Sequence, residues 1–558
     1  MTNKLARRLT LALGLAFAAS AAQAQDGPPS SGASYDPPAA EGQAAPENRG
    51  ERRARRERRA DIAPYLEVAQ GISTEFGGDT LTYTTVAAGV DGSVQTRRVT
   101  AVLSYRYDRQ IEWNGNTGDQ DSHSGIAAIS AQVIPGAVQI EAGALATRTG
   151  GEGRALGVTD RDEAVELYSV YAGPTVSTHV GPVAVNAAYR LGYVAIDDDS
   201  VSGGPDDGYD SSIAHSATAS VGMAPGRLPV GWTAGAGYAR TDADGPFDHA
   251  FEGAYVRGDV VVPVSPTLAV TAGVGYENIE ASQLDIARDA NGVPIVGADG
   301  RPVPDPTRPR LLTYRTDGLI YDAGLIWRPT ARTELQARAG HRYGGTTVVG
   351  SLAHQFSPHS GMNLVVVDSV ETFGNLIVND LSGLPDEFEV ARDPLTGSLG
   401  GCVFGADPGS GRCLDRALQS IRGNSFRMRG ASLVFSGSRG LWSWGAGGSY
   451  THRRFGRPDD PVFDIFGGGE DESFTLHGSL GRQLGRTSQL SADLYASWFD
   501  SDRAAFDAVF SAGGTVGYTR SFLMERLRLL GAVGLNHADD GAESSTVASG
   551  LLGLRYTF

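Results

Sequence analysis

The sequence contains almost no lysine. Lys4 is the only one in 558 residues and lies before Leu9, so the rest of the chain has no lysine to serve as a catalytic amine. Long apolar runs are scarce as well. After residue 24 no uninterrupted apolar stretch reaches twelve residues, whereas a membrane-spanning helix needs about 20. A helical membrane protein is excluded, and only strands closed into a barrel could still cross a membrane.

Positive charge is in deficit. The chain has 47 basic and 64 acidic residues and a formal net charge of −17, which argues against nucleic acid as a partner, because phosphate binding depends on clustered cations. With 41% hydrophobic residues the chain is too apolar to be disordered. Its 75 glycines are about twice the usual share, which disfavours a helical protein and favours an all-β one.

The N-terminus has the pattern of an export signal. Lys4, Arg7 and Arg8 precede an apolar run over 9–19, and Ala22 and Ala24 form a small-residue cleavage site. We expect a signal peptide over 1–24, with a retained anchor as the alternative. Residues 25–62 predict a flexible periplasmic arm rich in Pro, Gly and Arg. Six arginines within 51–59 could contact cell-wall polymer or anionic lipid, or could simply be solvated.

From Tyr65 onward, apolar and polar residues alternate over segments of about 9 to 14 residues. Between Val183 and Tyr193 the odd-numbered residues are apolar or aromatic, while Asn186 and Arg190 stand on the other face. The same split recurs over 334–342, 490–498 and 526–535. This pattern predicts a single large antiparallel transmembrane β-barrel over 63–558, with about 22 strands and a range of 18 to 22, facing outer-membrane lipid. An even number places both termini in the periplasm.

Connections between these segments alternate between short turns and longer polar loops, as in bacterial barrels. Short turns are predicted at Asp91-Gly92, Pro135-Gly136, Gly181-Pro182 and further sites of the same kind. The longest connection is 371–423, and loops of that length are usually functional or disordered.

The last strand carries the most specific local signal. Leu552, Leu554, Tyr556 and the terminal Phe558 alternate with the residues between them. The stretch from Gly553 through Tyr556 to Phe558 resembles the sorting signal of Gram-negative outer-membrane barrels. The resemblance implies location in the cell outer membrane and recognition by the barrel assembly machinery. Residues 64–70 and 81–92 are also similar to large uncharacterised barrels, some labelled as an accessory subunit of the Sec preprotein translocase. Nothing in the residues supports that role.

Cys402 and Cys413 are the only cysteines, and both lie in the longest loop. Export to an oxidising compartment predicts a disulfide between them. They could instead hold a metal, but neither has a nearby cysteine or histidine in the sequence to complete a zinc site. No metal and no other cofactor are assigned.

The long loop could enter the lumen or cover the surface. If it enters, its acidic residues Asp386, Glu387 and Glu389 would form a constriction opposite inward arginines, and the field between them would orient polar solutes. The inward candidates are Arg106, Arg190, Arg338, Arg342, Arg427 and Arg429.

No catalytic constellation is found. His215-Ser216 is a dipeptide on a predicted strand without a base and orienting acid, so we expect no enzyme. An energised receptor would need a plug of well over a hundred residues before the first strand, whereas about 40 separate Gln25 from Tyr65. The sequence therefore favours a passive, porin-like channel for small polar solutes. The alternative is a non-conducting barrel with a structural or assembly role, or one associated with surface polysaccharide.

Overall fold

The computed structural model describes residues 59–558 except 115–118, 151–164, 198–208, 298–300, 391, 400, 460–462, 464–468 and 503–507. The predicted signal peptide with Ala22 and Ala24, and most of the predicted arm, lie outside the described residues. Strand β1 begins at Arg59, four residues before the predicted start of the barrel at 63. Among the described residues, no helix has the length and apolar character needed to cross a membrane.

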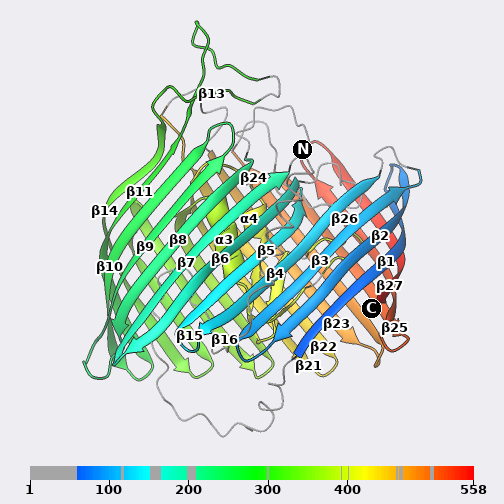
Figure 1. The fold of residues 1–558 in the computed structure, drawn as a ribbon, viewed down its shortest axis with the longest axis horizontal. Helices are drawn as coiled ribbons and strands as arrows, with labels where there is room; N and C mark the ends of the chain where they lie inside the picture. Colours follow the sequence, from blue (N-terminus) through cyan, green and yellow to red (C-terminus); the bar gives the residue numbers. More distant parts are fainter. Residues whose placement is uncertain are drawn as a thin grey trace.

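Twenty-two antiparallel strands form one sheet (Figure 1). The first eleven are β1 (Arg59–Glu75), β2 (Thr80–Gln95), β3 (Val99–Glu112), β4 (Gln120–Ile134), β5 (Val138–Thr149), β6 (Val165–Val180), β7 (Val183–Asp197), β8 (Ser211–Met223), β9 (Gly231–Asp244), β10 (His249–Ser265) and β11 (Leu268–Gln283). The others are β14 (Leu311–Thr330), β15 (Thr333–Arg342), β16 (Gly345–Ser357), β17 (Ser360–Glu371), β21 (Phe426–Arg439), β22 (Trp442–Phe455), β23 (Gly469–Gln483), β24 (Ser488–Ser501), β25 (Val509–Phe522), β26 (Leu527–Asp539) and β27 (Ser544–Thr557).

The sheet closes on itself. Strand β1 pairs with β2 on one side and with β27 on the other, where Tyr65 lies opposite Thr557 and Glu75 opposite Val547. Closure satisfies the backbone groups that an open edge would expose. The predicted all-β barrel and its count of 22 strands are confirmed.

The two faces of each strand follow the predicted alternation. In β7, Leu191 and Tyr193 are exposed on the outside, whereas Arg190 and Val194 are buried inside. In β24 the outward Leu494 is 65% exposed. Because lipid would cover this outer face, its apolar side chains need no protein partner.

Short turns gather at one end of the barrel, which we call the turn end, and the opposite end is the loop end. The predicted turn at Asp91-Gly92 is wrong, because both residues lie inside β2. Asp91 accepts a hydrogen bond from Ser104 on β3 and pairs with Arg555 on β27. The chain turns instead at 96–98, where the Thr96 hydroxyl accepts bonds from the backbone N–H groups of Arg98 and Val99.

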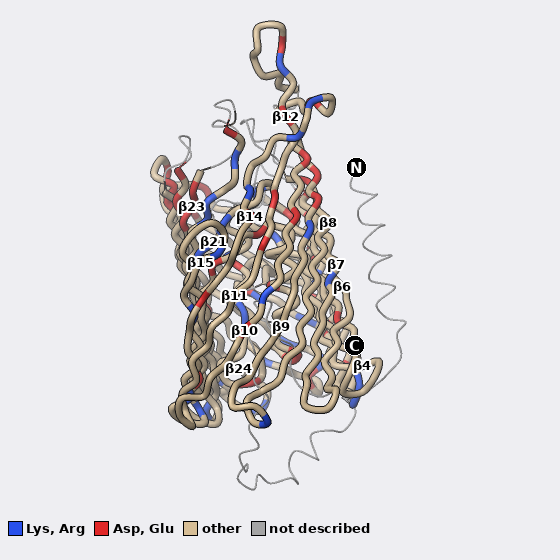
Figure 2. The backbone as a smooth tube through the Cα atoms, turned by 90° about the vertical axis from the view of Figure 1, so that its left-hand side faces the viewer, with Lys and Arg blue, Asp and Glu red and all other residues tan. Residues whose placement is uncertain are grey.

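Two insertions at the loop end carry further elements. The first, with β12 (Asp285–Ile286) and β13 (Pro304–Asp305), projects beyond the barrel (Figures 1 and 2). The second contains α3 (Phe373–Ser382), β18 (Phe388–Glu389), β19 (Cys402–Gly405), β20 (Gly411–Cys413) and α4 (Asp415–Leu418). It folds into the barrel, where α3 and α4 are seen between the front and back walls (Figure 1).

Candidate functional site

The lumen is occupied by residues 372–425, which we call the inner segment. It leaves the wall after Glu371 of β17 and returns at Phe426 of β21, and these two residues are partners in the same strand pair. The inner segment is therefore a long insertion in an ordinary hairpin. The predicted connection was 371–423, and of the two alternatives for its position the structure has the one inside the barrel.

Helix α3 anchors the segment to one wall. Thr372 caps the helix by accepting a bond from the backbone N–H of Asn375. Phe373, Leu376, Ile377 and Leu381 are fully buried, at the helical spacing of one apolar face. They belong to a hydrophobic cluster that includes the following inward residues of the wall: Leu145, Leu167, Val194 and Ala214. Contacts from α3 reach strands β5 to β9.

Glycine makes room for this helix. At Gly192 of β7, an added Cβ would lie 2.1 Å from Cγ2 of Val378. The hydroxyls of Thr241 and Thr372 are 2.9 Å apart, and the Asn375 amide also donates to Thr241 at 2.9 Å. The helix therefore touches the wall through both apolar and polar contacts.

A buried carboxylate holds the segment together. Asp380 is 0% exposed and lies within α3, where it pairs with two arginines from the later part of the segment. Its Oδ1 is 2.9 Å from Nη1 of Arg412, and its Oδ2 accepts a bond of 3.1 Å from Nε of Arg416. Burial lowers the pKa of Arg416, but the contact with Asp380 outweighs it and raises the pKa overall.

The middle of the segment lies against the part of the wall that runs from β25 to β27 and from β1 to β4. Arg392 donates to Ser104 of β3 at 3.1 Å and to Ser124 of β4 at 2.5 Å. Burial lowers the pKa of its guanidinium, with Arg106 acting in the same direction. Asp393 accepts a bond of 2.8 Å from Thr515 of β25. Leu395 packs in a cluster with the inward side chains Ala69, Tyr83, Ala532 and Leu551.

The segment also reaches the turn end. The backbone N–H of Gly409 donates to Ser436 of β21 at 2.9 Å. At Gly361, next to the turn between β16 and β17, an added Cβ would lie 2.6 Å from the Pro408 carbonyl oxygen. Since Thr372 is at the loop end, the inner segment extends through the barrel from one end to the other.

Cys402 and Cys413 form the expected disulfide, between register partners on β19 and β20. Both sulfurs are buried against Val434 of the wall and Phe404 of the segment.

The predicted acidic constriction is only partly assembled. Asp386 is exposed inside the barrel, and Glu387 accepts a hydrogen bond from Gln95 of β2. The side chain of Glu389 lies outside the part of the chain that the structure describes. Desolvation together with the nearby carboxylates of Glu141 and Glu387 raises the pKa of Asp386.

The inward arginines pair with the wall itself, not with these loop acids. Arg106 is 3.0 Å from Glu67, Arg190 contacts Glu141, and Arg342 is 2.9 Å from Glu277. Each guanidinium thus has a carboxylate on a neighbouring or nearby strand. The sequence located the arginines but not their partners, because the partners lie 39 to 65 residues away along the chain.

Arg427 and Arg429 do not face the lumen as predicted. They alternate with Phe426 and Met428, whose side chains pack in the interior cluster with α3. Arg427 is 2.9 Å from Asp368, and its Nη2 donates to the Thr346 carbonyl oxygen at 2.9 Å. The β15–β16 hairpin is short and turns at 343–344. Both arginines therefore reach its turn and hydrogen-bond to the Thr346 carbonyl oxygen there.

Four charges form a connected group on another part of the wall, which we call the charged arc. Arg257 and Asp259 of β10 are 2.6 Å apart, and Arg257 is 2.8 Å from Asp322 of β14. Arg338 of β15, a predicted lumen residue, is 2.6 Å from Asp259 and 3.0 Å from Asp322. The four formal charges cancel within the group.

The raised pKa of Asp386 predicts that the inner segment docks more firmly at acidic pH. A carboxyl whose pKa is raised in the docked state contributes full stability below its ordinary pKa, and that contribution is lost as pH rises through the raised value. Hydrogen exchange of residues 373–390, corrected for intrinsic rates, should show more protection at the lower pH. Asp386→Asn should flatten this dependence and exposed Asp407→Asn should not. Protection that increases with pH would contradict the assignment.

No known protein family model matches the chain, and no curated protein matches its sequence. Solved structures that it resembles include the iron transporter FrpB of Neisseria meningitidis, F5-1 variant, at 10% identity over 89% of this chain and 83% of that one, with a TM-score of 0.44. The ferric-catecholate import receptor Fiu of E. coli K12, in its closed form, is 9% identical over 90% of this chain and 82% of that one, with a TM-score of 0.45. The alcaligin outer-membrane receptor FauA of Bordetella pertussis is 12% identical over 88% of this chain and 76% of that one, with a TM-score of 0.34.

The chain has the fold of an outer-membrane β-barrel. At identities this low the likeness concerns the fold, and it assigns no substrate to this chain. The three named proteins are described as receptors or transporters, and that description applies to them and not to this chain.

Proposed function

We propose that this chain is a channel for small polar solutes in the outer membrane, and that the inner segment sets the width of its passage. The outer face supports the membrane location, because Leu552, Leu554 and Tyr556 of the last strand are all exposed there. The resemblance of this strand to a sorting signal supports assembly by the barrel machinery. The turn end, where the described chain begins and ends, would face the periplasm.

The observation that carries the proposal is the uneven placement of the inner segment. Its contacts reach strands β1 to β9, β17 and β21 to β27, and at the loop end Gly423 also approaches His249 at the start of β10. The charged arc lies further along β10 and on β14 and β15, where its four side chains pair with one another. A 22-stranded barrel is too wide for wall side chains to fill. We therefore place the solute path beside the charged arc, with the inner segment as its other side.

Planar-bilayer recording of the purified full chain tests this function. We expect stable, narrow openings in symmetric salt, because water must fill whatever the inner segment leaves free. A protein that inserts as a folded barrel and passes no current would contradict the channel and favour the non-conducting structural or assembly role. Folding is checked separately, by the difference in gel mobility between boiled and unboiled samples.

Ion selectivity should depend on the charged arc. Asp322→Asn leaves the arc with one excess positive charge, so the ratio of anion to cation permeability should rise by about two- to fivefold, since one charge about 4 Å from an ion in water contributes roughly 1 kcal/mol. The reversal potential in a salt gradient measures this ratio. Asp317→Asn is the matched control, because Asp317 lies on the same strand and bonds the outward Tyr276. Equal shifts in both variants would rule out a path beside the arc.

A further inference from the structure

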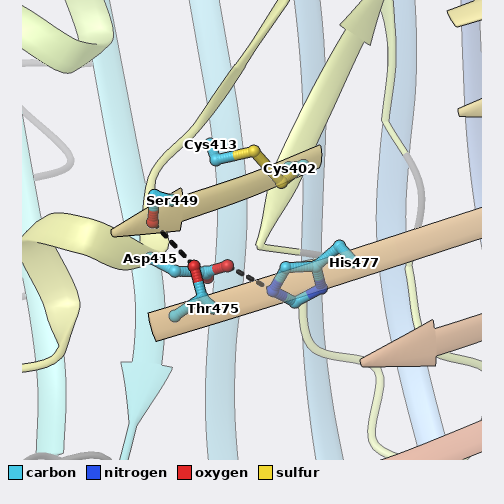
Figure 3. Close-up of a disulfide and its surroundings, with 6 residues drawn as sticks. All are labelled: Cys402, Cys413, Asp415, Ser449, Thr475 and His477. Atoms are coloured by element: carbon cyan, nitrogen blue, oxygen red, sulfur yellow. Dashed lines mark hydrogen bonds and ion pairs between the residues drawn. A yellow bond between two sulfur atoms is a disulfide. The ribbon is translucent and has the colours of Figure 1, made fainter. Parts of the chain in front are cut away.

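The disulfide of the inner segment lies beside a histidine and a carboxylate that the mechanism of conduction does not use. Figure 3 shows Cys402 and Cys413 above the pair formed by Asp415 and His477. One ligand atom from each of Cys402, Asp415 and His477 lies within 4.8 Å of the others. These residues come from β19, the start of α4 and β23, so three separate elements meet at one point.

The wall is shaped to accept this group. His477 of β23 lies directly opposite Gly447 of β22 in the strand pair. A Cβ at Gly447 would lie 2.5 Å from both sulfur atoms, so only glycine leaves room for them. Cys402 and Cys413 are 6% and 1% exposed, and Asp415 follows Cys413 by two residues. The buried sulfurs and the partly exposed imidazole and carboxylate therefore meet at one point of the wall.

We infer that, with its disulfide reduced, this site binds a thiophilic divalent cation such as zinc through Cys402, Cys413, Asp415 and His477. Two thiolates, one imidazole nitrogen and one carboxylate oxygen are a donor set that tetrahedral zinc accepts. In the oxidised protein the two sulfurs are bonded to each other and are not thiolate ligands. The disulfide and the cation are thus alternative ways to fasten β19 to β20.

The chemistry balances with a dithiol as the reductant. Two electrons and two protons pass from the dithiol to the Cys402–Cys413 disulfide, which becomes two thiols while the dithiol closes to its own disulfide. Binding of the cation then releases the two thiol protons, since thiolates are the metal ligands. His477 would coordinate the cation through a neutral imidazole nitrogen. Its direct contact with Asp415 must then open, so that both side chains bind the cation instead of each other.

Cobalt(II) is the probe, because it replaces zinc in tetrahedral sites and absorbs visible light, which zinc does not. The folded full-length protein is reduced anaerobically with a phosphine, which is then removed, and free thiols are counted. We expect one equivalent of cobalt to bind to the reduced protein with a thiolate-to-metal absorption band, and none to the oxidised protein. Added zinc should remove the band. This comparison uses only the natural sequence, so no variant needs to fold.

Variants then identify the ligands. His477→Ala and Asp415→Ala should weaken cobalt binding by at least about tenfold, and Cys402→Ser should lower the thiolate band to about half or less, because only the Cys413 thiolate remains. His452→Ala is the matched control, because His452 on the neighbouring β22 pairs with Glu470 at 3.2 Å. Equal affinity in His477→Ala and in the natural protein would overturn the site. So would a reduced protein that binds no cobalt, or a disulfide that stays intact in the folded barrel. None of these outcomes depends on whether the barrel conducts.

Discussion

Replacing residues 373–424 with a short turn should raise the single-channel conductance by roughly threefold or more, because a barrel of 22 strands without an internal element encloses a wide aqueous lumen. The strands can tolerate the deletion since Glu371 and Phe426 are already paired, so a tight connection can join them. Conductance in symmetric salt measures the effect, and larger neutral solutes should also enter liposomes that contain the shortened protein.

A deletion of similar design at the other insertion provides the control. The described residues 288–297 and 301–303 lie in the projecting insertion, between β12 and β13, and deleting 288–303 shortens the chain without emptying the lumen. We expect their removal to leave the conductance unchanged. If both deletions folded as barrels and neither changed the current, the inner segment would not set the width of the path.

Asp380→Asn should release the inner segment from its docked position while leaving the barrel folded. The substitution keeps the shape of the side chain but removes the charge that two arginines share in a fully buried place. Removing one partner of a buried pair costs about 3–5 kcal/mol, because the remaining charges stay buried without compensation. Protection of amides in 373–418 against hydrogen exchange should therefore fall by about 100-fold or more, at 1.4 kcal/mol per factor of ten.

Asp407→Asn is the matched control, since Asp407 lies in the same segment and is exposed. The strand amides should keep their protection in both variants, because the barrel ladder does not include Asp380. In bilayers, Asp380→Asn should give openings that fluctuate more than those of the natural protein. Unchanged protection of 373–418 in Asp380→Asn would show that the Asp380 pairs do not hold the segment.

The sequence did not show how two of these groups are assembled. Asp380 is the only charged residue between Phe373 and Leu381, and a charge there suggests a buried pair. Arg412 and Arg416 are more than thirty residues away, so nothing local identifies them as partners. His477 is 64 positions from Cys413 and looked irrelevant to the cysteines. Only the approach of the segment to β22 and β23 brings it there.

Some turns were predicted correctly and one was wrong, again because its contacts come from distant parts of the chain. Pro135-Gly136 and Gly181-Pro182 do connect strands, because such residues favour turn conformations wherever they stand. Asp91-Gly92 has comparable residues and yet continues strand β2, where the Asp91 side chain contacts Ser104 on the adjacent β3 and Arg555 on β27, two strands away. Arg427 and Arg429 were assigned to the lumen because they are charged. They bond instead to groups at the turn of the short β15–β16 hairpin.

The sequence by itself determined the barrel: its closed all-β architecture, its strand number and, for most strands, which side chains face outward. These follow from local properties, since successive side chains of a strand point to opposite faces and the difference between apolar and polar neighbours is visible one residue apart. The tertiary structure alone decided that residues 372–425 lie in the lumen, which charges pair, and that a histidine meets the disulfide. Those contacts join residues far apart in the chain, and their energies depend on which strands the closed sheet places side by side.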